Sequence, residues 1–570
     1  MYIDTLVCLA SECVREYELM QWRLTPTVSR FDAVALCRPD LSFDWPTMNV
    51  PSAESLLEQD FGLVAELIRA HARERPRQAA LIDDQRSVDF GALDQLMDRV
   101  ATSLQRDKVQ VGDAVAICAA SCVEYGVVFL GALRAGVAVA PLSPSATTES
   151  LVSMLADSGA RILFLDAAVA TMLATVALPS GLQLVRLDNA PGVRSLDAWL
   201  APAGSVPVPV DIAPDAAFNI IYSSGTTGTP KGIVQPHSMR WSHVRRARHF
   251  GYDGDAVTIC STPLYSNTTL VSFFPAIAGG GAAVLMAKFD VGKFLELSQR
   301  HRVTHAMLVP VQYQRLMDSP DFDRYDLSSY RMKFCTSAPF SAALKADILR
   351  RWPGGLIEYY GMTEGGGTCM LFAHQFPDKL HTVGQPVPGH DIRLIDEQGR
   401  EVSAGEIGEV VGRSAAMMKG YFNQPGQTVA AEWYDADGNR FIRTGDVGRF
   451  DADGFLTLMD RRKDMIISGG FNIYPSDLEA VLSQHPAVRD AAVVGVSSRE
   501  WGETPVAFVV LRPDANATAD AIKQWTNERL GKTQRLATVE LTTELPRNAI
   551  GKVLKRELRD QYSRAMAINR

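Results

Sequence analysis

Short apolar segments alternate with segments of helical periodicity along much of this chain. The apolar run at 113–120 (DAVAICAA) precedes a helical pattern at 125–136, and the run at 137–143 precedes another at 149–159. The same order returns over 280–310, in GGAAVLMA, KFLELSQRHRV and THAMLVP. Strands that alternate with helices form parallel sheets with helices packed on them. The sequence therefore predicts an α/β fold.

The pattern changes twice further along. Beyond about residue 383, glycines, turn residues and period-two alternation predict a smaller β-rich subdomain. Near 460–470 the chain becomes charged and then glycine-rich (DRRKDMIISGG), which indicates a domain boundary. Helices and strands alternate again beyond it. We expect a large N-terminal domain of parallel α/β sheets plus the β-rich subdomain, a small α+β C-terminal domain, and an irregular leader of unclear role at 1–55.

Charge and cysteine content exclude several classes of protein. Lys plus Arg number 57 and Asp plus Glu number 65 among 570 residues, a formal net charge of −8. This balance lacks the overall positive charge of a nucleic-acid binder, so no nucleic-acid partner is expected. Eight cysteines without a C-x-x-C pair argue against a zinc site or a disulfide scaffold. Reduced, mostly buried thiols in a cytoplasmic protein are the better interpretation.

Neither an export signal nor a membrane span is expected. A signal peptide begins with basic residues and continues with an apolar segment, but this chain has the acidic residues Asp4 and Glu12 at those places. Residues 256–287 carry no charge, but they contain Pro263, Pro275 and three consecutive glycines. A buried helix, a turn and a core strand fit this stretch better than a span of about 20 predominantly apolar residues.

The strongest local motif is YSSGTTGTPKG at 222–232, which follows an apolar run that reads as a strand. Glycines let backbone N–H groups approach an anion, Ser and Thr hydroxyls add donors, and Lys231 adds a positive charge. The motif is not a Walker A loop, because Pro230 and Gly232 replace the expected Gly and Ser/Thr. We predict a polyphosphate-binding loop rather than a flexible linker. Its candidate ligands are Ser223, Ser224, Gly225, Thr226, Thr227, Gly228 and Lys231.

Four further segments follow in order: YYGMTEGG (359–366), RTGD (443–446), RRKDMIISGGFNIYP (461–475) and PRNAIGK (546–552). Together with the phosphate loop, they make the chain resemble the adenylate-forming superfamily, and within it the acyl-CoA and aryl-CoA ligases. The resemblance runs from about residue 60 to 560. It implies an AMP-binding N-terminal domain at 56–460, a hinge at 461–464 and a mobile C-terminal lid domain at 465–570.

The resemblance also implies a reaction. Such enzymes use ATP and Mg²⁺ to convert a carboxylate into acyl-AMP with release of pyrophosphate, and the thiol of coenzyme A then displaces AMP. Adenylation is needed because a carboxylate is a poor electrophile. The implied partner is a small carboxylic acid, and a homodimer stays open.

The family roles fall on residues whose chemistry suits them. Glu364 matches the Mg²⁺ ligand, since a hard cation takes carboxylate and phosphate oxygens, and Thr363 can hydrogen-bond the α-phosphate. Asp446 matches the acceptor of the ribose hydroxyls, and Arg461 its partner. The predicted adenine slot comprises Ser337, Ala338, Pro339, Glu358, Tyr359, Tyr360 and Gly361. Ser337 replaces a family glycine, which predicts a changed backbone there.

The C-terminal domain is expected to serve both half-reactions. Lys552 matches the catalytic lysine, whose ammonium group can neutralise charge in the adenylation transition state; a solvated lysine in a basic stretch is the alternative. Lys463 matches the hinge about which the domain rotates between the half-reactions. The rotation would present Ser468, Gly469 and Gly470 to the thiol. Trp501 either stacks on the coenzyme A adenine or packs on the surface.

The acid pocket is the least constrained part. The segment containing Tyr265, Ser266 and Asn267 corresponds to a family stretch that usually has His at the Ser266 position. We expect this change, together with the small Gly365 and Gly366, to leave room for an aryl, alicyclic, branched or medium-chain acid. No acidic anchor for an amino acid's ammonium group is seen.

Three other functions compete with an acid–CoA ligase. The enzyme could stop at acyl-AMP and load a separate carrier protein, although no carrier domain is seen after Lys552. A light-emitting oxygenase on the same scaffold is more distant. A catalytically inactive nucleotide sensor is the third, and the intact Lys231, Glu364, Asp446 and Lys552 argue against it.

Overall fold

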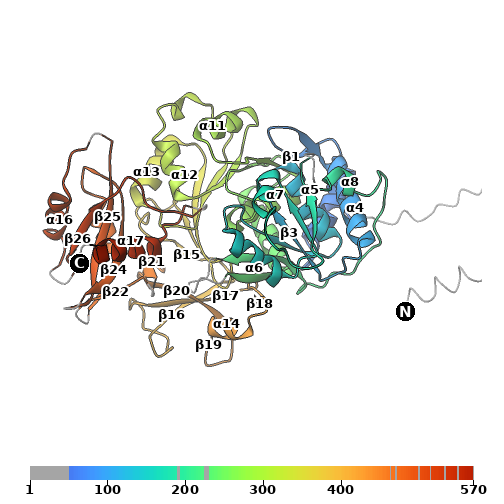
Figure 1. The fold of residues 1–570 in the computed structure, drawn as a ribbon. Helices are drawn as coiled ribbons and strands as arrows, with labels where there is room; N and C mark the ends of the chain where they lie inside the picture. Colours follow the sequence, from blue (N-terminus) through green and yellow to red (C-terminus); the bar gives the residue numbers. More distant parts are fainter. Residues whose placement is uncertain are drawn as a thin grey trace, which may run out of the picture. The chain divides into compact units, whose positions relative to one another are not determined.

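The structure is a computed structural model that describes residues 51–188, 193–223, 230–461, 464–468, 471–498, 501–513, 515–531, 534–548 and 551–568. The chain separates into two compact units, residues 1–51 and residues 52–570. All but the last residue of the first unit fall outside the described residues, and so does most of the predicted leader. The second unit carries every element labelled in Figure 1.

One sheet has seven strands in the order β18-β8-β7-β4-β3-β5-β6. Strands β7, β4, β3, β5 and β6 are parallel neighbours, whereas β8 and β18 join antiparallel at one edge. The five strands from β3 to β7 follow helices in the chain, as the alternating pattern predicted. The bounds are β3 Ala114–Cys118, β4 Ala138–Pro141, β5 Ile162–Leu165, β6 Gln183–Arg186, β7 Ala217–Ser223, β8 Lys231–Pro236 and β18 Gly420–Tyr421.

A second sheet has nine strands in the order β15-β14-β13-β12-β11-β9-β10-β1-β2. The six strands from β13 to β1 in this order are parallel, and the outer strands are antiparallel. The bounds are β1 Ala79–Ile82, β2 Ser87–Asp89, β9 Val257–Cys260, β10 Ala282–Leu285, β11 His305–Leu308, β12 Met332–Cys335, β13 Gly355–Tyr360, β14 Cys369–Phe372 and β15 Gln385–Pro386.

Helices cover these sheets. Their bounds are α2 Ala53–Leu57, α3 Val64–Glu74, α4 Phe90–Arg106, α5 Val123–Arg134, α6 Thr148–Ser158, α7 Ala167–Leu173, α8 Leu196–Trp199, α9 His237–Ala247, α10 Asn267–Ala278, α11 Val291–Arg300, α12 Pro310–Met317 and α13 Ala342–Arg351, with short 3₁₀ turns η1 Arg248–Phe250 and η2 Phe322–Arg324. The uncharged stretch at 256–287 is β9, α10 and β10, so the predicted buried helix and core strand are confirmed.

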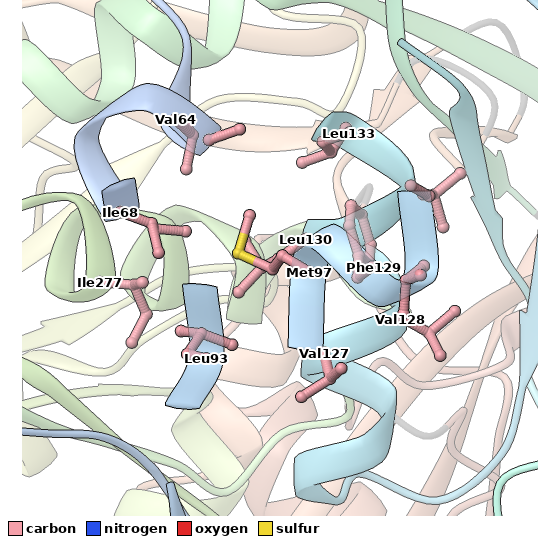
Figure 2. Packing of buried hydrophobic residues seen from close by; sticks show 14 of the residues in the cluster. Val64, Ile68, Leu93, Met97, Val127, Val128, Phe129, Leu130, Leu133 and Ile277 are labelled. Carbon is pink, nitrogen blue, oxygen red and sulfur yellow. The ribbon is translucent and has the colours of Figure 1, made fainter. Parts of the chain in front are cut away.

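The core between the two sheets is built from helices α3, α4 and α5. Figure 2 shows Met97 of α4 among Ile68 of α3 and Leu130 of α5, and all three side chains are fully buried. Gly131 lets α4 and α5 approach closely, because a Cβ there would lie 2.5 Å from Val100 Cβ. Dense packing of this kind fixes the sheets that carry the site residues.

The predicted β-rich subdomain is an antiparallel sheet of five strands. Its elements are β16 Asp391–Ile395, β17 Gly408–Arg413, α14 Pro425–Ala430, β19 Glu432–Tyr434, β20 Arg440–Phe450 and β21 Leu456–Arg461.

The C-terminal part forms a further five-stranded sheet with three helices. Helices α15 and α17 pack against β24, and α16 packs against β26; the elements are drawn in orange to red in Figure 1. They are β22 Ile466–Ser468, β23 Phe471–Ile473, α15 Pro475–Leu482, β24 Val488–Ser498, β25 Gly502–Leu511, α16 Ala519–Asn527, β26 Thr538–Leu541 and α17 Lys555–Ile568. The predicted fold class is confirmed, with a large parallel α/β domain and a small α+β C-terminal domain.

Cysteines and hydropathy agree with a folded α/β protein. Cys118, Cys260, Cys335 and Cys369 are buried free thiols. Burial raises the pKa of the Cys118 and Cys260 thiols to about 12, which leaves them unreactive near neutral pH. Over the described ranges, no helix is both long and apolar enough to cross a bilayer.

Candidate active site

Parallel strands of the nine-stranded sheet end side by side where several predicted site residues lie. β11 pairs with β12 and β12 with β13, all parallel, so their carboxyl ends meet at one edge. Ligands of open α/β sheets bind at such an edge. The segments leaving these strands are the start of α12, residues 336–339 and residues 361–366. The edge therefore gathers the predicted adenine slot and the GMTE motif.

Ser337 shows how the chain accommodates its departure from glycine. Its backbone has φ +81°, in the region that glycine adopts at little cost and other residues rarely enter. The Ser337 hydroxyl is hydrogen-bonded to Thr268 Oγ1 at 2.7 Å. The predicted change of backbone is therefore wrong: the serine keeps a glycine-like φ and ties this segment to α10. Ala338 is half-buried and Pro339 is exposed beside it.

The phosphate loop is framed by two antiparallel strands, with Ser223 opposite Lys231 in the register of β7 and β8. The predicted ligands Ser224, Gly225, Thr226, Thr227 and Gly228, and the side chain of Ser223, lie outside the described residues. The Lys231 ammonium group lies 5.0 Å from the centre of the Tyr421 ring. The Tyr421 hydroxyl donates a hydrogen bond of 2.8 Å to Glu364 Oε1. Tyr421 therefore connects the loop lysine with the predicted metal ligand.

Glu364 is held on its backbone as well as its side chain. Its carbonyl accepts from Met418 N at 2.7 Å, and the carbonyl of Thr363 accepts from Gln235 Nε2 at 2.6 Å. Within the described ranges no three His, Cys, Asp or Glu side chains come together as a metal site. The Glu364 carboxylate and the phosphate oxygens of a nucleotide are hard donors of the kind that Mg²⁺ takes, so Glu364 stays the predicted metal ligand.

Asp446 and Arg461 are direct partners across β20 and β21, which agrees with a shared target; the Arg461 side chain lies outside the described residues. Tyr360 donates a hydrogen bond of 2.9 Å from its hydroxyl to Asp446 Oδ2. The nearby Thr444 hydroxyl accepts from Asp446 N at 3.0 Å. The structure thus brings Tyr360 and Asp446 together, as binding of one nucleoside would require.

The two other residues of the predicted adenine slot on β13 face opposite sides of the sheet, because side chains alternate along a strand. Glu358 is buried in an ion pair with Lys345. Burial raises the pKa of its carboxyl group to about 7, against the opposing effect of Lys345. Tyr359 is half-buried on the other face, 5.5 Å from the ring centre of Phe334. Gly361 follows the strand and is exposed.

Lys552 lies in a tight turn of the C-terminal part. Asn548 Oδ1 accepts from Lys552 N at 2.9 Å, and Arg547 donates to the carbonyl of Gly551 at 2.6 Å. Gly551 has φ +75°, and a Cβ there would lie 2.5 Å from Val311 Cγ1. Val311 belongs to the first turn of α12, which begins directly after β11. The turn therefore contacts the same sheet edge as the GMTE motif.

Of the predicted hinge and coenzyme A residues, Lys463, Gly469 and Gly470 lie outside the described residues. Ser468 is half-buried and pairs with Gly502 in the register of β22 and β25. The neighbouring Trp501 has 52% of its surface exposed. The structure brings these two segments together, and the Trp501 side chain is not packed into the core.

The predicted acid pocket residues open helix α10. Ser266 is buried and is the N-cap of this helix, its hydroxyl accepting from Thr268 N at 3.3 Å. Asn267 follows, and its Oδ1 accepts from Arg240 Nη2 at 2.9 Å. Tyr265 is half-buried, and burial raises the pKa of its hydroxyl. Ser266 thus caps α10, a structural role that its hydroxyl supplies in addition to its small size.

Gly365 and Gly366 pack against the backbone of neighbouring chain segments. Both have positive φ, +76° and +88°. A Cβ on Gly365 would collide with the Ala416 carbonyl oxygen, and one on Gly366 would lie 2.7 Å from the Gly412 carbonyl oxygen. Their small size therefore serves the close approach of two chain segments. Whether they also enlarge the acid pocket stays a prediction.

Comparison with known proteins agrees with this geometry. The AMP-binding enzyme family matches residues 68–422, and the AMP-binding enzyme C-terminal domain matches residues 477–552. The chain belongs to the AMP-binding enzyme family. The prediction that the chain belongs to the adenylate-forming superfamily is confirmed. The prediction that it is an acid-activating enzyme is confirmed with it.

Among the relatives of this AMP-binding enzyme, a 4-coumarate–CoA ligase of Oryza sativa subsp. japonica is 31% identical over 529 residues, covering 90% of this chain and 93% of the relative. A 4-coumarate–CoA ligase of Pinus taeda is 32% identical over 493 residues, covering 84% and 90%. The o-succinylbenzoate CoA synthetase of Bacillus subtilis, solved with its acyl-adenylate intermediate, superposes with a TM-score of 0.75 at 28% identity, covering 87% and 98%.

Two residues near the GMTE motif of this AMP-binding enzyme escaped the sequence analysis. Tyr421 reaches Glu364 because β18 pairs with β8 across a long sequence separation. Gln235 reaches the Thr363 carbonyl from the end of β8. Neither contact has a local signature in the sequence, since each depends on which strands become neighbours.

Proposed function

We propose that the protein is an ATP-dependent ligase that activates a carboxylic acid, in the first instance an aryl acid, to acyl-AMP and then transfers the acyl group to coenzyme A. The single observation that carries this proposal is the seating of the Lys552 turn against Val311, at the sheet edge that also holds the GMTE motif. The names of the relatives, 4-coumarate–CoA ligases among them, support an aryl acid and a thiol acceptor.

In this proposal the chain's own residues divide the work of adenylation. Lys231 and the loop at 223–228 bind the polyphosphate through cationic and N–H donors. Asp446 accepts the ribose hydroxyls, with Tyr360 fixing its carboxylate. Lys552 neutralises the charge that develops between the acid's oxygen and the α-phosphate. Bound Mg²⁺, held by Glu364, would supply charge neutralisation on the phosphates.

The second half-reaction needs the coenzyme A-binding segment, in place of Lys552, next to the acyl-AMP. We infer that rotation about 461–464 withdraws Lys552 and brings Ser468, Gly469 and Gly470 toward the acyl-AMP. Glycines at this point would leave space for a narrow pantetheine arm. The exposed Trp501, beside the strand pair that holds Ser468, is placed to contact the coenzyme A adenine.

The test is a pyrophosphate-release assay over a panel of aryl, alicyclic, branched and medium-chain acids, with and without coenzyme A. We expect acid-dependent pyrophosphate release, and acyl-CoA and AMP when the thiol is added. Pyrophosphate release without thioester would favour a ligase that loads a separate carrier protein. Nucleotide binding without pyrophosphate from any acid would overturn the proposal in favour of a sensor.

A further inference from the structure

Helix α9 and the 3₁₀ turn η1 that follows it carry two kinds of arginine. Arg245 and Arg248 are exposed, and each has a carboxylate partner, Asp60 at 3.7 Å and Glu54, respectively. Arg240 is fully buried and Arg246 is half-buried, and neither forms an ion pair with any described carboxylate. Burying a guanidinium group without a counter-charge is costly. The two more buried arginines, for which an unpaired charge costs most, are therefore the two that lack a carboxylate partner.

Arg240, His243 and Arg246 recur every three residues, so each is a neighbour of the next on the surface of α9; His390 joins them from the loop before β16. We call these four residues the basic row. Arg246 Nη1 contacts His390 Nε2 at 3.1 Å. Arginine can only donate, so His390 Nε2 is the acceptor and the neutral ring carries its proton on Nδ1. That Nδ1, His243 Nδ1 and Arg240 Nη1 have no described hydrogen-bond partner.

Burial keeps the histidines of the row neutral and leaves the arginines charged. It lowers the pKa of His390 to about 4 and the pKa of His243 well below its ordinary value, with Arg246 adding to both effects. Burial also lowers the pKa of Arg240, to about 9, and that of Arg246. Asp391, next to His390 in sequence, is engaged by Arg393 at 2.7 Å. The net charge of the row near neutral pH is therefore positive.

One end of the row is tied to the site. Arg240 donates to Asn267 Oδ1 at 2.9 Å and also to Gln235, whose amide group donates to the Thr363 carbonyl at 2.6 Å. The acceptors of Arg240 are neutral amide oxygens of Asn219, Gln235 and Asn267. Arg240 thus positions the predicted acid pocket residue Asn267 and the backbone of the GMTE motif. Its role is that of a positioning residue.

The side chains at the other end of the row keep some solvent exposure. His243 and Arg246 are half-buried, and the half-buried Tyr359 beside them makes no hydrogen bond through its hydroxyl with any described group. Arg246 lies six residues beyond Arg240, so the two are about 9 Å apart along the helix axis at about 1.5 Å per residue. This spacing separates the far end of the row from the end that is tied to Asn267 and the GMTE motif.

We propose that Arg246, with His243 and Tyr359, binds a second carboxylate at the far end of the acid, so that the substrate is an extended dicarboxylic acid and Tyr359 serves the acid rather than the predicted adenine slot. The inference rests on the proposed function. Arginine matches a carboxylate with two parallel N–H donors, and an anion supplies the counter-charge that the fold lacks there. A neutral phenol or alkyl end would leave the charge of Arg246 uncompensated.

The test compares 4-carboxycinnamate with 4-coumarate and cinnamate by kcat/KM for pyrophosphate release. We expect the wild-type enzyme to favour 4-carboxycinnamate by about tenfold or more. Arg246→Gln should remove that preference by about ten- to a hundredfold, the usual effect of losing a charged hydrogen bond, and spare cinnamate. Arg246→Lys should retain part of it. Arg245→Gln is the matched control on the same helix and should leave all three acids unchanged.

The outcomes separate the two proposals. Turnover of cinnamate or 4-coumarate equal to or faster than that of 4-carboxycinnamate by the wild-type enzyme would overturn the dicarboxylate inference and leave the ligase proposal intact. This comparison needs no variant, so it holds even if Arg246→Gln fails to fold, which its melting temperature would reveal. Equal losses on all three acids in a folded Arg246→Gln would also overturn the inference. Absence of pyrophosphate from every acid of the wider panel would overturn the ligase proposal itself.

Discussion

At the edge of the nine-stranded sheet, the candidate residues are positioned by strand register and by a packed core, whereas the turn that carries Lys552 meets that edge through Gly551 and Val311. Hydrogen bonds hold Tyr360 to Asp446 and the Glu364 backbone to Met418. The Lys552 turn is held by hydrogen bonds of its own, so in the proposed rotation it would move as a unit. We call the sheet edge with Tyr360, Asp446 and Glu364 the fixed part, and the turn with Lys552 the detachable part. In the proposed mechanism, groups needed in both half-reactions lie on the fixed part, and the group needed only in the first lies on the detachable part.

The largest expected effect tests the detachable part directly. Lys552→Ala should lower acyl-AMP formation by about 10²–10³-fold, because one contact to developing charge is lost. Thioester formation from pre-made acyl-AMP should change little. Both steps are followed by pyrophosphate release and by thioester yield. Arg556→Ala, in the same basic stretch, is the control, and equal losses in both half-reactions would make Lys552 a structural residue.

A smaller effect of the opposite kind is expected at the hinge. Lys463→Pro should spare adenylation and slow thioester formation about tenfold or more, because proline fixes φ near −65° and resists a backbone rotation. The measurement is the ratio of the two half-reaction rates. An unchanged thioester rate would move the pivot to Asp464, whose carboxylate is held by Arg559 at 2.6 Å.

The contact between the two parts can be broken without touching Lys552. Gly551→Ala should slow adenylation about tenfold, because its Cβ would press on Val311 and its φ of +75° disfavours a side chain. Val311→Ala should restore part of the rate in the double variant by removing the clash. If the two substitutions are simply additive, the contact with Val311 does not seat the turn.

On the fixed part, Glu364→Gln should raise the Mg²⁺ concentration needed for half-maximal pyrophosphate release several-fold, since the amide loses the charge that holds a hard cation. The melting temperature should stay close to that of the wild type. Tyr421→Phe removes only the hydrogen bond to Glu364 and should shift the Mg²⁺ titration less. Superimposable titrations for Glu364→Gln and the wild type would remove Glu364 from the metal site.

The last effect concerns the wall of the acid pocket. Ser266→His should penalise acids branched near the carboxylate more than linear ones, because an added ring that must be fitted costs about 1–3 kcal/mol. It also removes the cap of α10, so Ser266→Asn, which can still cap, is the control. The ratio of kcat/KM for a branched and a linear acid is the measurement. An unmoved ratio would mean that Ser266 caps the helix without lining the pocket.

Much of this protein could be predicted from its sequence, for a physical reason. Periodicity and local turn chemistry act between near neighbours, so the α/β class, the β-rich subdomain and the buried stretch at 256–287 were all visible in the residue pattern. The glycine-rich loop pointed to its chemistry for the same reason, because a few adjacent residues form it, whereas the role of the GMTE motif came from the family resemblance.

Tertiary structure decided what depends on distant neighbours. The sequence shows three arginines on α9, but only the fold reveals that Arg245 meets Asp60 while Arg246 meets no described carboxylate. It shows a serine at 266 but not the cap it forms, and a tyrosine at 421 but not Glu364 beside it. Which charges are buried, which strands pair and which helix end is capped are settled when the sheets pack, since packing determines which distant groups come into contact.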